Sequence, residues 1–114
     1  MPIVYLIHLD RPLNHAKHYL GYSALESVVD RLARHKAGYG ARLLAACNEQ
    51  GIDYHIVRIW ECDTTRQAKA LERSLKKRHD TPNLCPCCNP KNAKYRVDID
   101  VEGISQNCNR GIPF

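Results

Sequence analysis

The sequence has no long hydrophobic run. No stretch of its 114 residues approaches the ~20 consecutive apolar residues that a membrane-spanning helix requires. The first residues also lack the basic segment followed by an apolar one that is typical of a secretory leader. No internal repeat or low-complexity tract is present, which excludes solenoids and linker arrays. We therefore expect a soluble, unprocessed protein with no membrane partner.

The length of the chain suits one domain. With 44% hydrophobic and 25% charged residues, 114 residues can bury one core but are too few for two ordinary domains. The chain has six cysteines and no leader, which indicates a reducing compartment. There, thiols more often bind metal, pack in the core or catalyse than form disulfides, so we expect a cytoplasmic protein.

The charge is basic. Seventeen Lys and Arg against twelve Asp and Glu give a net charge of +5 and a pI near 9.0, which suits a polyanionic partner but also fits many other proteins. Part of this charge is clustered at Arg73, Lys76, Lys77, Arg78 and His79. These side chains either contact successive phosphates of a nucleic acid or form a solvated helix face.

Two short strands are predicted first. The apolar run from 3 to 9 is rich in β-branched and aromatic residues, and Arg11-Pro12 interrupts it. A second extended segment covers 17 to 22, and the loop between the segments lets them pair antiparallel. This hairpin brings Tyr5 near Tyr19.

Two helices and a strand are predicted next. The capping-box spacing of Ser23 to Glu26 and an apolar stripe predict a helix over about 25–36, ended by Gly38 and Gly40. A second helix covers 41–49 and ends at Gly51. Residues 54–61 alternate as a central or half-buried strand does.

A third helix and an irregular tail complete the chain. Thr64 to Gln67 repeats the capping-box spacing, and the helix that follows ends near Arg78, before a turn. The predicted order is therefore β-β-α-α-β-α, an α+β chain. From Asn83 onward Cys, Pro and Asn dominate, with a further strand expected over 95–101 and no periodicity in 103–114.

Several residues have the chemistry needed to cleave a phosphodiester. That reaction requires a positioned water, a group that takes its proton, positive charge on the phosphoryl oxygens and help for the leaving oxygen. Arg31 and His35 stand at i and i+4, on one helix face and outside the apolar stripe. We therefore expect them to face a shared groove.

The order of these residues resembles that of the GIY-YIG nuclease family. The matching positions are Val4-Tyr5, Tyr19-Leu20-Gly21, Arg31, His35, the loop 38–42, Ala70-Leu71-Glu72 and Asn83. The resemblance covers about residues 3 to 83. The composition of 84–114 separately predicts a Cys-rich extension packed on the same domain, about which the resemblance implies nothing. The resemblance implies a three-stranded antiparallel sheet flanked by helices and a nuclease domain over 1–83. It also implies DNA as the partner and one divalent cation, Mg²⁺ or Mn²⁺.

The resemblance assigns a role to each catalytic candidate. Glu72 would bind the cation, which stabilises the leaving 3′ oxygen. Tyr5 or Tyr19 would orient the attacking water, Arg31 would neutralise phosphoryl charge, and His35 would bind phosphate or relay a proton. Taken singly, each has an ordinary structural explanation, such as a core aromatic or a solvated helix residue. Together and in family order, they favour a nuclease.

The substrate-binding candidates are Lys17, His18, Arg42, Lys76 and Asn83. The chain departs from the family at two positions, since no Gly precedes Val4-Tyr5 and the usual basic residue after the second half-motif is Tyr22. Lys17 or His18 would replace that basic residue. The departures leave open a catalytically weak nucleic-acid-binding module on the same scaffold. A homo-oligomer or a larger assembly also remains open.

The cysteines suggest a second metal. Cys85-Pro86-Cys87-Cys88 has the C-x2-C spacing of a zinc knuckle, and Cys108 or His79 would complete a tetrahedral site with Cys85 and either Cys88 or Cys87. A second C-x2-C is absent, so free thiols clustered in a turn remain an alternative, as does a zinc-stabilised interaction protein. Cys47 and Cys62 are expected to be buried as small apolar residues.

Overall fold

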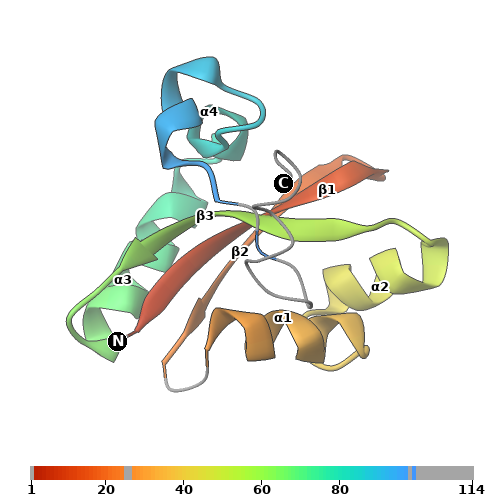
Figure 1. Ribbon diagram of the computed structural model, residues 1–114, viewed down its shortest axis with the longest axis horizontal. Coiled ribbons are helices and arrows are strands. Elements are labelled where there is room, and N and C mark those ends of the chain that lie inside the picture. The colour runs from red at the N-terminus through yellow and green to blue at the C-terminus, as the bar shows by residue number, and fades with distance from the viewer. Residues whose placement is uncertain (1, 25–26, 98, 100–114) are drawn as a thin grey trace, which may run out of the picture.

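The computed structural model describes residues 2–24, 27–97 and 99. Its elements follow in the order β1 (Ile3–Leu13), β2 (Ala16–Ser23), α1 (Val28–Lys36), α2 (Arg42–Gln50), β3 (Tyr54–Glu61), α3 (Thr65–Lys77), α4 (Thr81–Leu84) and the 3-10 helix η1 (Pro90–Tyr95) (Figure 1). The first six match the predicted order. In the described ranges, no helix is long and apolar enough to cross a membrane.

The three strands form one antiparallel sheet in the order β2-β1-β3. The expectation of a three-stranded antiparallel sheet flanked by helices is thus confirmed. The central strand β1 pairs Tyr5 with Gly21 and His8 with His18 across the β2 ladder. On its other side, the register against β3 shifts by one residue between Leu6 and Ile7. This bulge lets both ends of β3 keep their apolar side chains in the core.

The side chains of β1 alternate between two cores. Tyr5, Ile7 and Leu9 face one side, where they pack with Leu32 of α1 and Leu44 of α2. Val4 and Leu6 face the other side, where Leu75 of α3 covers them. Figure 1 shows the sheet between these helices, with α1 and α2 on one side and α3 on the other. A central strand buried on both faces accounts for the uninterrupted apolar run at the start of the sequence.

The hairpin is longer than predicted. β1 continues to Leu13, so Arg11-Pro12 lies within the strand instead of ending it. Pairing becomes irregular between His8 and Leu13, which accommodates a proline that cannot donate to the ladder. The turn then needs only two residues, with Asn14 at φ 56°. Of the predicted loop around Pro12, Leu13, Asn14 and His15, only Asn14 and His15 form the turn, and the assignment of Pro12 and Leu13 to it was wrong.

The start of α1 was also predicted wrongly. Ser23 lies in β2, and the residue that caps α1 is Ser27, whose side chain accepts a hydrogen bond from the Asp30 backbone N–H. Both serines precede an apolar stripe, so the sequence pattern alone does not separate them. Elsewhere the boundaries agree, since β3 spans the predicted 54–61 and Thr64 caps α3 as expected.

The segment after α3 forms compact turns. α4 and η1 follow in close succession, and Figure 1 shows them beside the sheet. Tyr95, expected to begin a strand, ends η1. Ile99 forms an isolated antiparallel bridge with Ile56 of β3, and the rest of the predicted 95–101 strand lies partly outside the described residues. Cys47 and Cys62 are buried, as predicted.

Candidate functional site

The hydroxyl of Tyr5 lies between an imidazole and a guanidinium. Its oxygen is 3.0 Å from His35 Nε2 and 3.3 Å from Arg31 Nε. Because Arg31 Nε–H can only donate, the phenol oxygen accepts from it and directs its own proton to His35. Nε2 of His35 then accepts, which places the imidazole proton of a neutral ring on Nδ1. The two helix residues expected to share a face thus meet at one phenol.

The local backbone fixes the position of His35. This residue is buried near the C-terminus of α1, and Asn48 of α2 donates a hydrogen bond to its carbonyl oxygen at 2.8 Å. Gly40 passes against the ring with φ 115°, and a Cβ there would lie 2.8 Å from His35 Nδ1. The glycine-containing loop is therefore required for the close approach between backbone and imidazole.

Tyr19 completes an aromatic group around these residues. Its ring centroid is 6.4 Å from that of Tyr5 and 5.8 Å from that of His35, the latter in an edge arrangement. The hairpin thus brings the two tyrosines together, as predicted. Tyr19 is half-buried on the edge strand β2, while Tyr5 is fully buried in β1. Of the two phenols, Tyr19 is the more exposed.

Glu72 lies on α3, and its charge acts on both phenols. Its side chain is 19% exposed and its Oε2 lies 3.5 Å from Nζ of Lys76. Burial raises the pKa of Tyr5 to about 12, and the charge of Glu72 adds to the increase while Arg31 opposes it. Burial also raises the pKa of Tyr19, with Glu72 again adding to the shift. Residues from β1, β2, α1 and α3 therefore share one electrostatic environment.

The substrate-binding candidates lie in several places. Lys76 is on the same side as Glu72, with its Nζ 5.8 Å from the centroid of the Tyr19 ring. Lys17 is exposed on β2 and Arg42 is exposed at the start of α2. Asn83 lies in α4, where its backbone carbonyl accepts hydrogen bonds from the side chains of Asn89 and Asn92.

His18 belongs to a different group. His8, His18, Cys85 and Cys88 bring their four ligand atoms within 4.8 Å of one another. Burial lowers the pKa of His18 to about 4, with His8 and Lys17 contributing to the decrease. His18 is thus a neutral imidazole at neutral pH, the form that binds metals. The group fits a transition metal such as zinc better than Mg²⁺.

Only part of this group was predicted. Cys85 and Cys88 are members, whereas Cys87 is exposed outside it. His79, offered as a fourth ligand, is exposed beyond the end of α3 and is not a member, and Cys108 lies outside the described residues. The two histidines were missed because they lie more than 65 residues before the cysteines. The sequence did contain one indication of this pair, because one His lies on each strand of the predicted hairpin.

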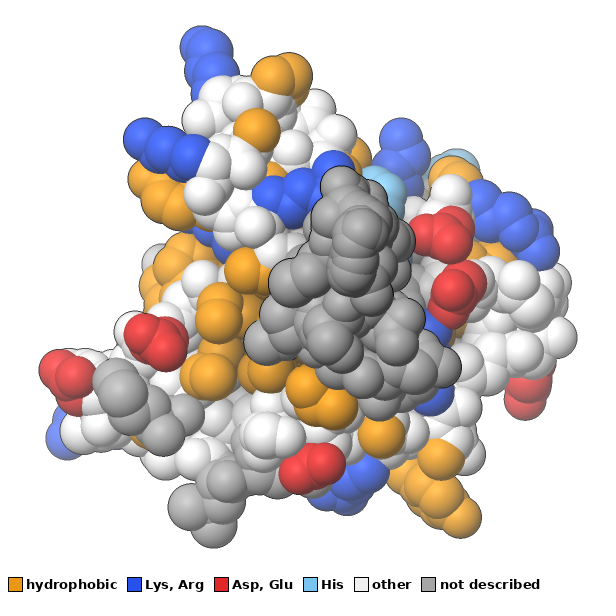
Figure 2. Space-filling model, in the orientation of Figure 1, with side chains coloured by type: hydrophobic (Ala, Val, Ile, Leu, Met, Phe, Trp, Pro, Cys, Tyr) orange, Lys and Arg blue, Asp and Glu red, His pale blue; other side chains and the backbone are white. Residues whose placement is uncertain are grey.

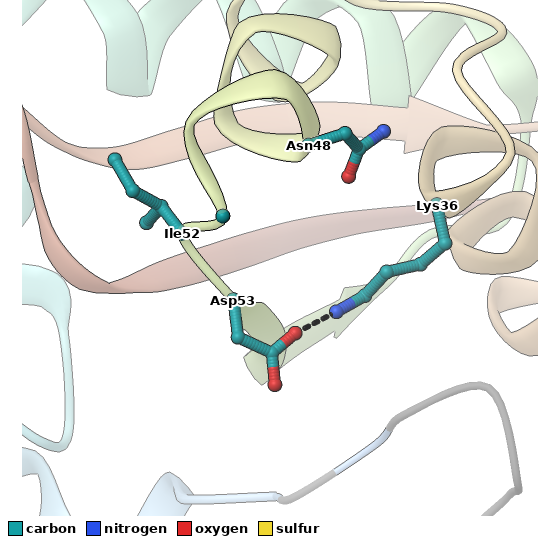
Figure 3. A pocket seen from close by; sticks show the side chains of 5 residues that line it. Lys36, Asn48, Ile52 and Asp53 are labelled. Carbon is teal, nitrogen blue, oxygen red and sulfur yellow. Dashed lines mark hydrogen bonds and ion pairs between the residues drawn. The ribbon is translucent and has the colours of Figure 1, made fainter.

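A separate pocket opens beside α1 and α2. It is lined by Lys36, Asn48, Gly51, Ile52 and Asp53, and an ion pair between Lys36 and Asp53 spans it (Figure 3). Burial alone would raise the pKa of Asp53, but hydrogen bonds from the Lys36 side chain and the Tyr54 backbone hold this pKa below its usual value. The pocket contains none of the catalytic candidates, and its two charged residues, Lys36 and Asp53, neutralise each other.

Comparisons with protein-family models, with curated proteins and with solved structures found no match to this chain. Among the described residues, two groups of side chains are candidate functional sites. One gathers two phenols, a guanidinium, an imidazole and a carboxylate. The other gathers two imidazoles and two thiols.

Proposed function

We propose that this protein is a metal-dependent endonuclease that hydrolyses phosphodiester bonds of DNA. The observation that supports it most is the position of the Tyr5 hydroxyl, which is hydrogen-bonded to both His35 and Arg31. Tyr19 packs against the same imidazole, and the charge of Glu72 acts on both phenols. Proton transfer, phosphoryl stabilisation and cation binding each have a residue within this group.

The hydrogen-bond direction suggests how a water could lose its proton. A phenol with a pKa of about 12 keeps its proton at neutral pH, so Tyr5 does not act as a free phenolate. Tyr5 can instead accept the proton of an attacking water that enters beside its half-buried neighbour Tyr19, while it passes its own proton to His35 Nε2. The imidazole becomes an imidazolium, and the oxygen of the water forms the new bond to phosphorus.

Arg31 has two roles in this scheme. Its Nε–H stabilises negative charge that develops on the Tyr5 oxygen during the transfer. Its planar guanidinium also matches the geometry of two phosphoryl oxygens, which a lysine does not. Tyr19, half-buried at the sheet edge, would orient the water or the scissile phosphate.

Glu72 is the residue that would hold Mg²⁺ or Mn²⁺. A single carboxylate suits these ions, because they keep several waters and need few protein ligands. The side chain is partly exposed and its charge reaches the phenols, which fits this assignment. When bound, the ion would stabilise negative charge on the leaving 3′ oxygen.

Positive side chains near the site favour a nucleic-acid partner. Arg73, Lys76, Lys77 and Arg78 are all exposed on α3 or just after it, on the element that carries Glu72. Figure 2 shows further Lys and Arg side chains over the α4 and η1 segment, with no acidic side chain among them in that view. Binding by these residues would depend strongly on salt concentration.

The test is nicking of supercoiled plasmid by the purified protein with Mg²⁺, with Mn²⁺ and with chelator. Wild type should nick only with metal, and Glu72→Gln should lose at least ~100-fold of the rate. Glu49→Gln, which changes an exposed carboxylate on α2, is the matched control and should retain full activity. Unreduced nicking by chelator-treated Glu72→Gln would exclude this role for the carboxylate.

One observation favours a second function, a nucleic-acid-binding module without strong catalysis. The ion pair with Lys76 gives the Glu72 carboxylate a partner other than a metal. If that pair persists in solution, the protein would bind DNA but not cut it. Equal DNA binding by wild type and Glu72→Gln, with no nicking by either, would support this function.

A further inference from the structure

Four metal-binding side chains from distant parts of the chain converge at one end of the sheet. His8 of β1 and His18 of β2 face each other across the ladder, with ring centroids 5.2 Å apart. Cys85 at the end of α4 and Cys88 in the following turn approach the same point. Since these residues lie about 70 to 80 positions from the histidines, the fold alone assembles the group.

The distances within this group match tetrahedral coordination. Zinc with Zn–N bonds of about 2.0–2.1 Å and Zn–S bonds of about 2.3 Å places two nitrogens about 3.4 Å apart and a nitrogen and a sulfur about 3.6 Å apart. His8 Nδ1 and His18 Nε2 are 3.3 Å apart. Sγ of Cys85 is 3.6 Å from His8 Nδ1, and Sγ of Cys88 is 3.6 Å from His18 Nε2. Cys88 Sγ and His8 Nδ1 are 3.9 Å apart, and all pairs lie within 4.8 Å.

The donor set selects the metal and its role. Two thiolates and two imidazoles favour zinc over the oxygen-preferring Mg²⁺ or Ca²⁺. Four protein ligands leave no open position for water or substrate, which is typical of a structural site. Nδ1 of His18 is buried and has no hydrogen-bond partner among the described residues, so its ring meets polar partners at the Nε2 side, toward the thiols.

We propose that His8, His18, Cys85 and Cys88 form a structural zinc site that fastens the α4–η1 segment to the hairpin. α4 has four residues and η1 has six, too few to be stable alone. Besides the group itself, Arg58 of β3 contacts the segment through the Leu84 carbonyl and the Tyr95 ring. Zinc adds a cross-link between chain positions far apart in sequence, which stabilises the folded state.

This site does not depend on the proposed nuclease activity. His8 stands three residues after Tyr5 in β1, and strand alternation puts the two on opposite faces of the sheet. The two metals also differ, because the zinc ligands are thiols and imidazoles whereas the cation at Glu72 would be bound by oxygen. Loss of one site is therefore measurable while the other is intact.

The experiment measures zinc in the full-length protein purified without added metal. We expect about one zinc per chain in the wild type and nearly none in Cys88→Ser, whose exposed position makes it the variant best able to fold. Cys87→Ser is the matched control, since it removes an exposed thiol one residue away and should keep the metal. Cys108→Ser should also keep it.

Cobalt substitution covers the case in which the variants fail to fold. Co²⁺ in the wild-type protein should give tetrahedral ligand-field bands and a thiolate charge-transfer band set by two sulfur ligands. His18→Cys keeps four ligands, so it should retain the metal and show the stronger charge-transfer band of three thiolates. Wild-type protein without zinc and without a cobalt thiolate band would overturn the proposal. So would zinc that is lost in Cys87→Ser or Cys108→Ser but kept in Cys88→Ser.

Discussion

Gly21 lies directly opposite Tyr5 in the β1–β2 ladder, and the Tyr5 ring covers it. A Cβ at position 21 would lie 2.6 Å from the Tyr5 hydroxyl oxygen. The glycine thus creates the space in which this hydroxyl reaches His35 and Arg31. This contact explains why the residue two positions after Tyr19 is a glycine.

Gly21→Ala should displace the Tyr5 ring. Because Tyr5 is fully buried and cannot move without disturbing its neighbours, we expect a loss of about 1–3 kcal/mol in the free energy of unfolding, measured by urea denaturation. Nicking should fall in parallel. Gly51→Ala is the control, since nothing lies within 4 Å of its added Cβ and only its φ of 70° is unfavourable. A fully stable and active Gly21→Ala protein would contradict this account of the glycine.

Arg31→Ala should reduce nicking by at least ~100-fold, and Arg31→Lys should recover little of it. Lysine supplies a charge but lacks the planar fork that can contact Tyr5 and a phosphate together. Arg34→Ala, an exposed residue on the same helix, serves as the control and should remain active. Full rescue by lysine would mean that Arg31 acts only as a point charge.

The raised pKa of Tyr5 predicts a stability change at alkaline pH. Its folded value is about 12, above the ordinary value near 10, so the folded state holds this proton more tightly. The stabilisation is fully present below pH ~10 and is lost as the pH rises toward ~12, by up to ~3 kcal/mol. Tyr5→Phe removes this loss. The stability advantage of wild type over Tyr5→Phe should therefore shrink above pH ~10.

Urea unfolding of both proteins at several alkaline pH values provides the measurement. Tyr54, whose pKa burial also raises to about 12, is present in both proteins, so its contribution cancels in the difference. Lysine titration cancels in the same way. A difference that stays constant to pH ~12 would show that the Tyr5 phenol is not protected by burial.

Arg58→Ala should loosen the α4–η1 segment. The guanidinium lies 4.5 Å from the Trp60 ring centroid and 4.4 Å from that of Tyr95, and its Nη1 donates to the Leu84 carbonyl at 2.8 Å. Losing these contacts should cost about 2 kcal/mol of stability. Arg58→Lys should recover only part, because lysine cannot stack between two rings. Hydrogen exchange of 81–95 would follow the loosening, and unchanged protection in Arg58→Ala would contradict it.

The sequence was most informative where local pattern and tertiary structure agree. β3 alternates over 54–61 and ends in turns, so its boundaries were predictable. The start of α1 was not, because Ser23 and Ser27 both precede apolar residues and only tertiary pairing assigns Ser23 to β2. The extension of β1 through Pro12 likewise depends on an irregular register that no local propensity records.

The site shows the same division. Arg31 and His35 were paired correctly because helix geometry relates residues four apart. Their common contact with Tyr5 could not be predicted in the same way, because it depends on the strand register, which local sequence pattern does not determine. His8 and His18 were missed as a pair for that reason, since they become neighbours only when Tyr5 is aligned with Gly21.

The alternation of β1 makes this strand unusually intolerant of length changes. Within four residues it sends Tyr5 toward α1 and His8 toward the cysteines, on opposite sides of one backbone. Inserting or deleting a single residue between them would reverse one of these directions, because the side-chain period of a strand is two. The spacing between Tyr5 and His8 is therefore constrained by both proposed sites at once.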